Sequence, residues 1–179
     1  AIVASPLRLL DCSPISDGVA AVILSSKKSN RKTQILGFGH AQDTLALQDR
    51  QDLGKLVATQ KAAKQAFNQA GLSQKDIQAI EVHDCFSIAE ILATEDLGFF
   101  SKGQAAKAIA KGQATYGGLV IVNPSGGLKA CGHPVGATGV KQVAFLASLI
   151  EANQFDRALA HNVGGSGATA IVNILGIKT

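Results

Sequence analysis

The sequence predicts an α/β fold, a three-layer α/β/α sandwich around a mixed five-stranded sheet. Short apolar runs alternate with segments of helical period, as in proteins whose parallel strands are joined by helices. Of the 179 residues, 46% are hydrophobic and only 4% are aromatic, which favours a core of closely packed Ala, Val, Ile and Leu. The last two apolar runs are joined by the short turn VGGSG, which predicts a hairpin and therefore one antiparallel strand.

Five apolar runs are expected to form the strands. The first, VAAVILS, is apolar without interruption, which is typical of a strand buried on both faces. In the second, TQILGFGH, Gly37 and Gly39 predict a bulge or the close approach of another backbone. The expected strands cover residues 19–25, 33–40, 77–82, 158–162 and 168–175.

Four segments are expected to form helices. In the first, Ala63, Phe67 and Ala70 follow a period of roughly 3.6 residues, and Gly71 ends the helix. Gly98 ends the second helix, the third is weaker, and the fourth follows a proline. The expected helices cover residues 53–70, 87–97, 102–111 and 135–152.

Composition argues against several classes of protein. The net charge is +4, and the one basic cluster, residues 27–32, has no interleaved aromatic residues, which indicates a solvated turn rather than a nucleic-acid site. A mildly basic surface also suits a polyanionic small molecule. Three cysteines without metal-ligand spacing argue against a disulfide framework and a metal site, and predict a reducing, cytoplasmic location. No apolar run reaches the roughly 18 residues that predict a membrane span.

The length suits a single domain over residues 1–179. The chain contains no methionine and begins with AIVA, a strand-like segment. We interpret these two features as indicating a piece of a larger protein.

The run NPSGGLKACGHPVGATG, residues 123–139, is the most informative segment. It has too many glycines for an ordinary helix and too few charges for an ordinary surface loop. Pro134 suits the first position of a helix, which would place His133 beside the helix N-terminus. The positive end of the helix dipole there favours a neutral imidazole, which can accept a proton or donate a hydrogen bond to an oxyanion. The alternative is a histidine that only caps the helix.

Glycines in the same run could also allow a ligand to approach. Ser125, Gly126 and Gly127 would let a ligand lie against the backbone. A second glycine-rich segment begins at Gly164. Its glycines expose N–H groups that could bind an oxyanion, although such a turn often serves only to close a hairpin.

His83 and Cys85 belong to the sequence HDCF, which follows an expected strand. In open α/β sheets, binding sites lie at the C-terminal ends of strands, so we expect these side chains to meet in one pocket. A thiol near histidines can perform acid–base or nucleophilic chemistry. The alternative for the cysteine is a small buried hydrophobic residue.

Three segments together resemble the C-terminal half of a thiolase: SDGVAAVILSS, HDCF and NPSGGLKACGHPVGATG, in this order. The resemblance extends over essentially the whole chain. HDCF stands where most thiolases have NEAF, and in this respect the chain resembles thiolases of the sterol-carrier-protein type. The resemblance implies the fold of the thiolase C-terminal domain. It also implies conversion of a 3-ketoacyl-CoA and CoA into acetyl-CoA and a shortened acyl-CoA, or the reverse condensation, with no metal or prosthetic group.

The resemblance also implies roles for individual residues. His133 would activate a nucleophilic cysteine and line the oxyanion hole. His83 would hold the water of that hole, and Cys85 would move a proton at the α-carbon of acetyl-CoA. Other thiolases carry that thiol in a CxG motif, which here reads HNVG, so that only the N–H of Gly164 carries over.

One part of the thiolase pattern is absent from this chain. The nucleophile of thiolases lies in a CxS motif in their N-terminal half, and Cys12-Ser13-Pro14 does not match it. We therefore expect half of a catalyst, with the N-terminal thiolase half and acyl-CoA as partners, inactive alone and forming a homo-oligomer at full length. Two alternatives are a non-catalytic thiolase-fold subunit that binds acyl-CoA or a partner, and a thiol-redox or metal protein, for which the ligands are too few.

Overall fold

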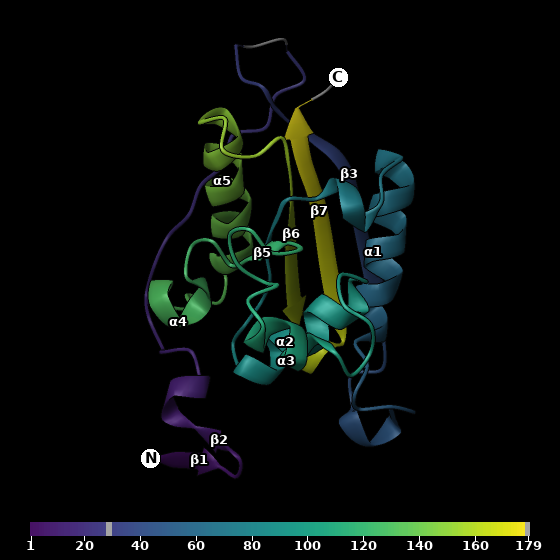
Figure 1. The fold of residues 1–179 in the computed structure, drawn as a ribbon, viewed down its shortest axis with the longest axis vertical. Coiled ribbons are helices and arrows are strands. Elements are labelled where there is room, and N and C mark those ends of the chain that lie inside the picture. Colours follow the sequence, from purple (N-terminus) through teal and green to yellow (C-terminus); the bar gives the residue numbers. More distant parts are fainter. Residues whose placement is uncertain (28–29, 178–179) are drawn as a thin grey trace.

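The computed structural model describes residues 1–27 and 30–177 (Figure 1). Its main sheet has five strands in the order β3-β7-β6-β4-β5. Strand β7 is antiparallel to both β3 and β6, whereas β4 is parallel to β6 and to β5. The predicted mixed sheet with one antiparallel strand is confirmed. The strands are β3 (Thr33–Gln42), β4 (Ala79–Glu81), β5 (Ile121–Val122), β6 (Arg157–Gly164) and β7 (Thr169–Ile177).

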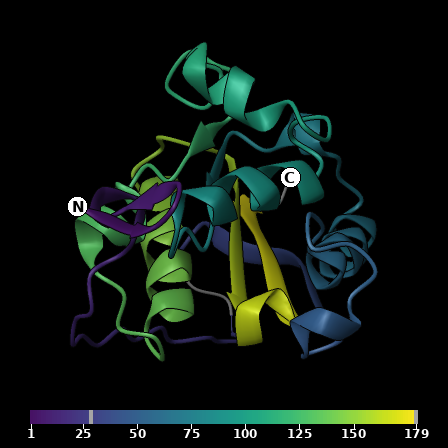
Figure 2. The same ribbon diagram turned by 90° about the horizontal axis from the view of Figure 1, so that it is seen from below.

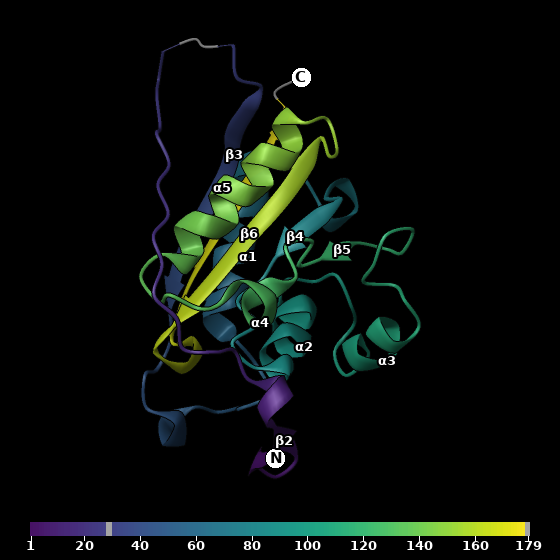
Figure 3. The same cartoon turned by 90° about the vertical axis from the view of Figure 1, so that its left-hand side faces the viewer.

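Helices cover both faces of this sheet, which confirms the three layers. Figures 1 and 2 show α1 and α5 on opposite sides of the central strands. Two shorter helices, α2 and α3, lie below β4 and β5 in the view of Figure 3, and α4 lies within the glycine-rich run. The helices are α1 (Val57–Ala70), α2 (Ser87–Asp96), α3 (Ala105–Ala110), α4 (Gly127–Cys131) and α5 (Thr138–Glu151).

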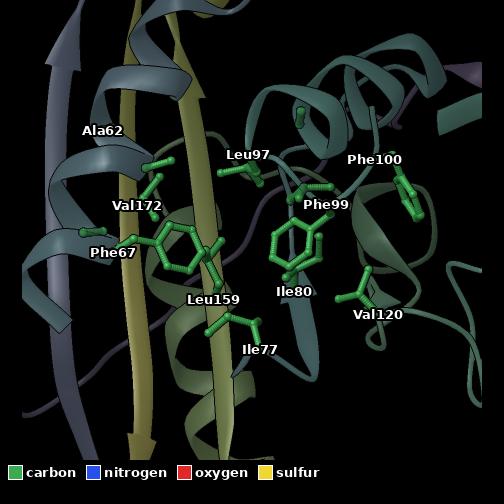
Figure 4. Packing of buried hydrophobic residues seen from close by; sticks show 14 of the residues in the cluster. Ala62, Phe67, Ile77, Ile80, Leu97, Phe99, Phe100, Val120, Leu159 and Val172 are labelled. Atoms are coloured by element: carbon green, nitrogen blue, oxygen red, sulfur yellow. The ribbon is translucent and has the colours of Figure 1, made fainter. Parts of the chain in front are cut away.

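Two hydrophobic clusters hold the layers together. The larger cluster joins α1 to the sheet and extends to the segment after α2, with Phe67, Leu159 and Ile80 along its length (Figure 4). The smaller cluster lies under α5, where Leu146 and Ile150 pack on Ala158. Aliphatic residues and alanines predominate in both, as the composition predicts. The edge of the sheet formed by β3 and β7 is covered by α1 on one face only, and Ile35 and Ile171 on it remain partly exposed.

The prediction of a strand at residues 19–25 is wrong. This segment is extended but pairs with no strand in the described parts of the chain. It runs beside α5 as a strap (Figures 1 and 3), and Val19 and Ile23 are 94% and 95% exposed. An apolar run indicates that a segment is suited to burial, but it becomes a strand only where another backbone offers hydrogen bonds. Part of the charged turn predicted at residues 27–32 lies outside the described residues.

The chain before the strap forms a small ribbon of its own. Strands β1 (Ile2–Ala4) and β2 (Leu7–Arg8) pair antiparallel, and a single 3₁₀ turn, Leu9–Asp11, follows them. Figure 1 shows this ribbon at one end of the molecule, away from the main sheet.

Helix α1 begins four residues later than predicted, at Val57. The N–H of Leu56, which precedes the helix, donates to the Asp96 carboxylate at 2.7 Å. The predicted end is confirmed, because Gly71 adopts a left-handed conformation with φ of 65°. Partners from distant segments therefore set the start of this helix, whereas a local glycine ends it.

Gly37 and Gly39 lie where α1 crosses β3, and they allow the two backbones to approach closely. A Cβ atom at Gly39 would lie 2.0 Å from the carbonyl oxygen of Ala62, and one at Gly37 would lie 2.2 Å from that of Ala66. The register of β3 also shifts between Ile35 and Gly37. Both readings of these glycines, a bulge and a close approach, are confirmed.

Gly39→Ala is therefore expected to lower the free energy of unfolding by about 2–3 kcal/mol, because the methyl group forces a packed helix away from the sheet. Gly136→Ala is the matched control, since a Cβ there meets nothing within 4 Å. Urea unfolding followed by circular dichroism measures both. Equal stabilities for the two variants would contradict the close packing of α1 on β3.

Candidate active site

The candidate site lies at the C-terminal ends of β4 and β6. His83 follows β4 by two residues and is 7% exposed. Its ring meets that of His133 edge to face, with ring centres 4.7 Å apart and planes at 88°. Two histidines that are 50 positions apart in the sequence thus form one cluster.

His133 is held by hydrogen bonds at both its backbone and its side chain. Its N–H donates to the Ser16 hydroxyl at 2.7 Å, and its Nδ1 lies 2.8 Å from the Thr138 hydroxyl. Ser16 belongs to the segment that leads into the strap. The sequence offered no pattern to reveal it, because a single serine in a loop has no periodicity.

The expected position of His133 beside a helix N-terminus needs correction. Helix α5 begins at Thr138, not at Pro134, and Ala137 is the residue before it. The Pro134 carbonyl accepts hydrogen bonds from the N–H groups of Ala137 and Thr138, which forms a turn before the helix. Proline suits the first position of a helix, but it suits a turn equally well. His133 reaches the start of α5 only through the Thr138 side chain.

The glycine-rich run is tied to β4 by a buried carboxylate. Glu81, 1% exposed, accepts hydrogen bonds from the Ser125 N–H at 2.9 Å and from the Ser125 hydroxyl at 2.8 Å. Lys141 of α5 reaches the same serine oxygen at 2.8 Å and lies 3.4 Å from Glu81. This cluster joins β4, the run and α5, the three segments that carry or flank the two histidines.

Gly126 and Gly127 have a conformational role in this run. Both have positive φ, 87° and 67°, and a Cβ at Gly127 would lie 2.1 Å from Asp84. The Asp84 carboxylate accepts a hydrogen bond from the N–H of Leu128 at 2.9 Å, inside the short helix α4. The sequence analysis did not predict this short helix within the run. Asp84 and Glu81 supply the partners that the sequence pattern did not reveal, although a glutamate within an otherwise apolar strand was a visible signal.

Ligand binding by Ser125, Gly126 and Gly127 stays a prediction. In this structure the polar groups of Ser125 all have partners within the protein.

Cys85 lies just beyond His83 and is partly buried. Burial raises the pKa of its thiol, and the neighbouring Asp84 carboxylate raises it further. The thiol is therefore protonated at neutral pH, which suits a proton donor better than a nucleophile. Cys131 is exposed, and its sulfur lies 3.2 Å from the Ser125 carbonyl oxygen.

Gly164 is the last residue of β6, opposite Thr169 in the confirmed hairpin. Arg50 holds the turn that follows: its guanidinium donates to the carbonyl oxygens of Ser166 at 2.9 Å and of Thr44 at 2.8 Å. The oxyanion-binding role of the Gly164 N–H stays a prediction.

His161 and Asn162 lie within β6, in agreement with the strand expected over residues 158–162. Neighbouring residues of a strand point to opposite faces. The fully buried His161 lies 2.9 Å from the Thr59 hydroxyl on α1, whereas Asn162 donates to Gln142 on α5 at 3.1 Å. Only Asn162 therefore faces the side of the sheet that carries His133.

Burial makes His83 and His161 weak bases. It lowers the pKa of His161 to about 3 and that of His83 to about 4, and nearby imidazoles contribute to both shifts. The unfolded chain, with histidine pKa values of about 6.5, binds more protons than the folded chain over this range. Stability must therefore fall as the pH is lowered from about 6.5 towards 4.

When the pH falls from 6.5 to 5, we expect each of these histidines to lower the free energy of unfolding by on the order of 2 kcal/mol. Burial raises the pKa of Asp84 and of Glu90, which acts in the opposite direction. Urea unfolding at pH 7 and pH 5 should therefore compare the unmodified chain with His83→Gln/His161→Gln. The variant is expected to lose less stability on acidification; an equal loss would contradict neutral, buried histidines.

Within residues 1–27 and 30–177, no three His, Cys, Asp or Glu side chains gather in a way that could hold a metal ion. None of the helices in these ranges combines the length and the apolar character needed to cross a bilayer.

Comparison with known proteins gives a consistent picture. The model of the thiolase C-terminal domain-like family matches residues 39–177. An acetyl-CoA acetyltransferase of Methanothermobacter thermautotrophicus is 47% identical, over 97% of this chain and 48% of its own length. The namesake enzyme of Methanocaldococcus jannaschii is 40% identical, over 98% of this chain and 50% of its own length. Sterol carrier protein 2 of Gallus gallus is also 40% identical, over 92% of this chain and 33% of its own length.

This chain thus spans about half the length of the first two of these relatives. Among solved structures, the Ltp2-ChsH2(DUF35) aldolase superposes with a TM-score of 0.78 over 99% of this chain and 49% of that chain. At 23% identity, this likeness concerns the fold alone.

Proposed function

Because this chain belongs to the thiolase C-terminal domain-like family, we propose that it supplies one half of the active site of a thiolase-type acyl-CoA acyltransferase. The observation that carries the proposal is the contact between His83 and His133 at the C-terminal end of the sheet, with the Cys85 thiol two residues along the chain. The substrates are a 3-ketoacyl-CoA and CoA, or two acyl-CoA molecules in the condensing direction, and no prosthetic group takes part.

Each residue has a defined task in cleavage. His133 takes the proton from a cysteine thiol supplied by the other half, and the thiolate attacks the 3-keto carbon. The bond between the α- and β-carbons then breaks, which leaves the acyl group on that cysteine. Cys85, kept protonated by its raised pKa, gives its proton to the departing α-carbon of acetyl-CoA. CoA finally gives its thiol proton to the Cys85 thiolate and attacks the acyl carbon, so that acyl-CoA leaves and the released cysteine thiolate takes its proton back from His133.

Hydrogen-bond donors of the chain and a bound water stabilise the oxyanions that develop during the reaction. His133 and a water held by His83 face one developing oxyanion, and the N–H of Gly164 faces the other. His83 suits this task because its pKa of about 4 keeps the ring neutral at pH 7. A neutral ring can bind a water without attracting an anion of its own.

The other half of the enzyme has a suitable surface to cover. A groove of about 660 Å³ lies between the strap, α5 and the uncovered face of β3 and β7. Its walls include Val22, Val140 and Ile171, which are 40%, 38% and 48% exposed. Exposed apolar side chains that gather on one face of a protein in this way mark an interaction surface. The N-terminal thiolase half covers it, and the complete protein forms a homo-oligomer.

The test compares this chain alone with a protein in which the first half of the Methanothermobacter thermautotrophicus relative precedes it. Cleavage of acetoacetyl-CoA is followed by the loss of its enolate absorbance. The joined protein is expected to cleave, and the chain alone is not. Turnover by the chain alone would contradict the role of half a site, and an inactive, folded joined protein would contradict acyl transfer.

A non-catalytic subunit that binds acyl-CoA or a partner is the second candidate. It is favoured by the relatives named sterol carrier protein 2. The same joined protein distinguishes the two, because a binding subunit retains acyl-CoA on a gel-filtration column without consuming it. For either function we propose a reducing, cytoplasmic location, in line with the three free cysteines.

A further inference from the structure

Two hydrogen-bonded carboxamides, Asn162 and Gln142, connect the surroundings of His83 to α5, and neither has been given a role so far. Glu81 of β4 pairs with Ala160 of β6 in a parallel register, so two residues further on His83 and Asn162 lie on the same face of the sheet. The Asn162 side chain donates through Nδ2 to Oε1 of Gln142 at 3.1 Å. Gln142 projects from α5 and is 1% exposed. The sheet and the helix thus meet beside His83 through one amide–amide hydrogen bond.

The bond to Gln142 limits which groups of Asn162 can face His83. A carboxamide has two N–H donors and one carbonyl acceptor, and Gln142 takes one of the donors. Of the groups that remain, the carbonyl fits, because the hydrogen bond with Asn162 favours the protonated His83 ring, as expected when the ring donates. This hydrogen bond raises the pKa of His83, against the larger lowering that burial causes.

The same hydrogen bond determines the tautomer of His83. A neutral imidazole carries one N–H donor and one lone-pair acceptor. The His83 Nδ1 atom is buried and has no hydrogen-bond partner in the described part of the chain. The nitrogen that donates to Asn162 is therefore Nε2, and Nδ1 keeps the lone pair.

We propose that Asn162 and Gln142 are positioning residues, which hold His83 in its Nε2-protonated tautomer and thereby present Nδ1 as a hydrogen-bond acceptor inside the site. Such an acceptor orients a water or a substrate hydroxyl by taking one of its protons. Gln142 acts at one remove, because it prevents the Asn162 carboxamide from turning over. In the proposed thiolase-type reaction, on which the catalytic consequence rests, this acceptor binds the oxyanion-hole water.

The tautomer can be measured without any catalytic activity. Two-bond ¹H–¹⁵N spectra of the histidine-labelled chain at pH 7 distinguish the two tautomers, and the signals of His83 are identified by their loss in His83→Gln. We expect the Nε2-protonated pattern in the unmodified chain and a mixture of tautomers in Asn162→Leu. Asn173→Leu, on the same face of the sheet, is the matched control and should leave the pattern unchanged.

Gln142 provides a second, independent test should Asn162→Leu fail to fold. Gln142→Glu keeps an oxygen acceptor and should retain the Nε2-protonated pattern, whereas Gln142→Met removes the acceptor and should give the mixture. An Nδ1-protonated ring in the unmodified chain would overturn the proposal. So would an unchanged pattern in both Asn162→Leu and Gln142→Met.

Kinetics of the joined enzyme then test the catalytic consequence separately. Gln142→Met is expected to lower kcat about tenfold with little change in KM, the factor that one ordinary hydrogen bond supplies. Gln142→Glu should restore most of this loss. If the spectra behave as expected and the joined enzyme is inactive, the positioning role stands and the proposed function fails. If the enzyme is active and Gln142→Met leaves kcat unchanged, the catalytic part of this inference fails.

Discussion

His133→Ala is expected to lower the turnover of the joined thiolase-type enzyme by a factor of about 10²–10⁴, the usual loss when a general base is removed. The variant takes away both the group that deprotonates the nucleophilic cysteine and a donor to the oxyanion. The effect should fall mainly on kcat, because the ring contacts His83 and Thr138 and lies at the reacting centre rather than along a binding groove. Initial rates of acetoacetyl-CoA cleavage give kcat and KM directly.

His40→Ala is the matched control for this prediction. His40 is an exposed histidine on the edge strand β3, and its ring lies 3.1 Å from the Thr169 hydroxyl of β7. Its replacement should leave turnover within about twofold, in keeping with a surface substitution. Near-normal turnover of His133→Ala in a folded protein would remove this histidine from the mechanism.

Cys85→Ala is expected to abolish proton transfer at the α-carbon while sparing formation of the acyl-enzyme. The thiol is kept protonated by burial, and no other thiol in HDCF or in HNVG can take its place. Turnover should fall by about 10²–10⁴. The distinguishing measurement is exchange of the acetyl-CoA α-protons with deuterated water, which should fall in parallel with turnover.

Two further measurements test the assignment of this proton transfer to Cys85. Labelling of the nucleophilic cysteine by radioactive acetyl-CoA should persist, since that step needs His133 and not Cys85. Cys131→Ala, which removes an exposed thiol, should exchange α-protons at the unmodified rate. Rapid exchange by Cys85→Ala would assign the proton transfer to another group.

Much of the fold was predictable because its elements carry their own local signals. Strands β3, β6 and β7 follow from apolar runs, and α1 and α2 from helical periodicity followed by glycine. The failures share a cause. The run at residues 19–25 has the composition of a strand but lacks a partner backbone, and the turn after Pro134 has the signal of a helix start but delays the helix by four residues.

The site was predictable in part for a similar reason. His83, Cys85 and His133 stand in short motifs whose residue types suggest chemistry in themselves. Ser16 and Gln142 do not, and Glu81 shows only an unexpected charge in an apolar strand, because all three act through partners that lie far away in the sequence. A hydrogen bond between distant segments leaves no periodic trace in either of them.

The sequence by itself determined the α/β class, the single antiparallel strand, the glycine stops and the family that HDCF and GHP indicate, because these depend on local composition and on short motifs. Only the tertiary structure decided that the two histidine rings meet, that the Glu81 carboxylate binds the glycine-rich run, and that Asn162 faces α5 while His161 faces α1. The physical reason is that hydrogen-bond partners, burial and the pKa shifts that follow from them depend on distances between segments, which only the folded chain defines.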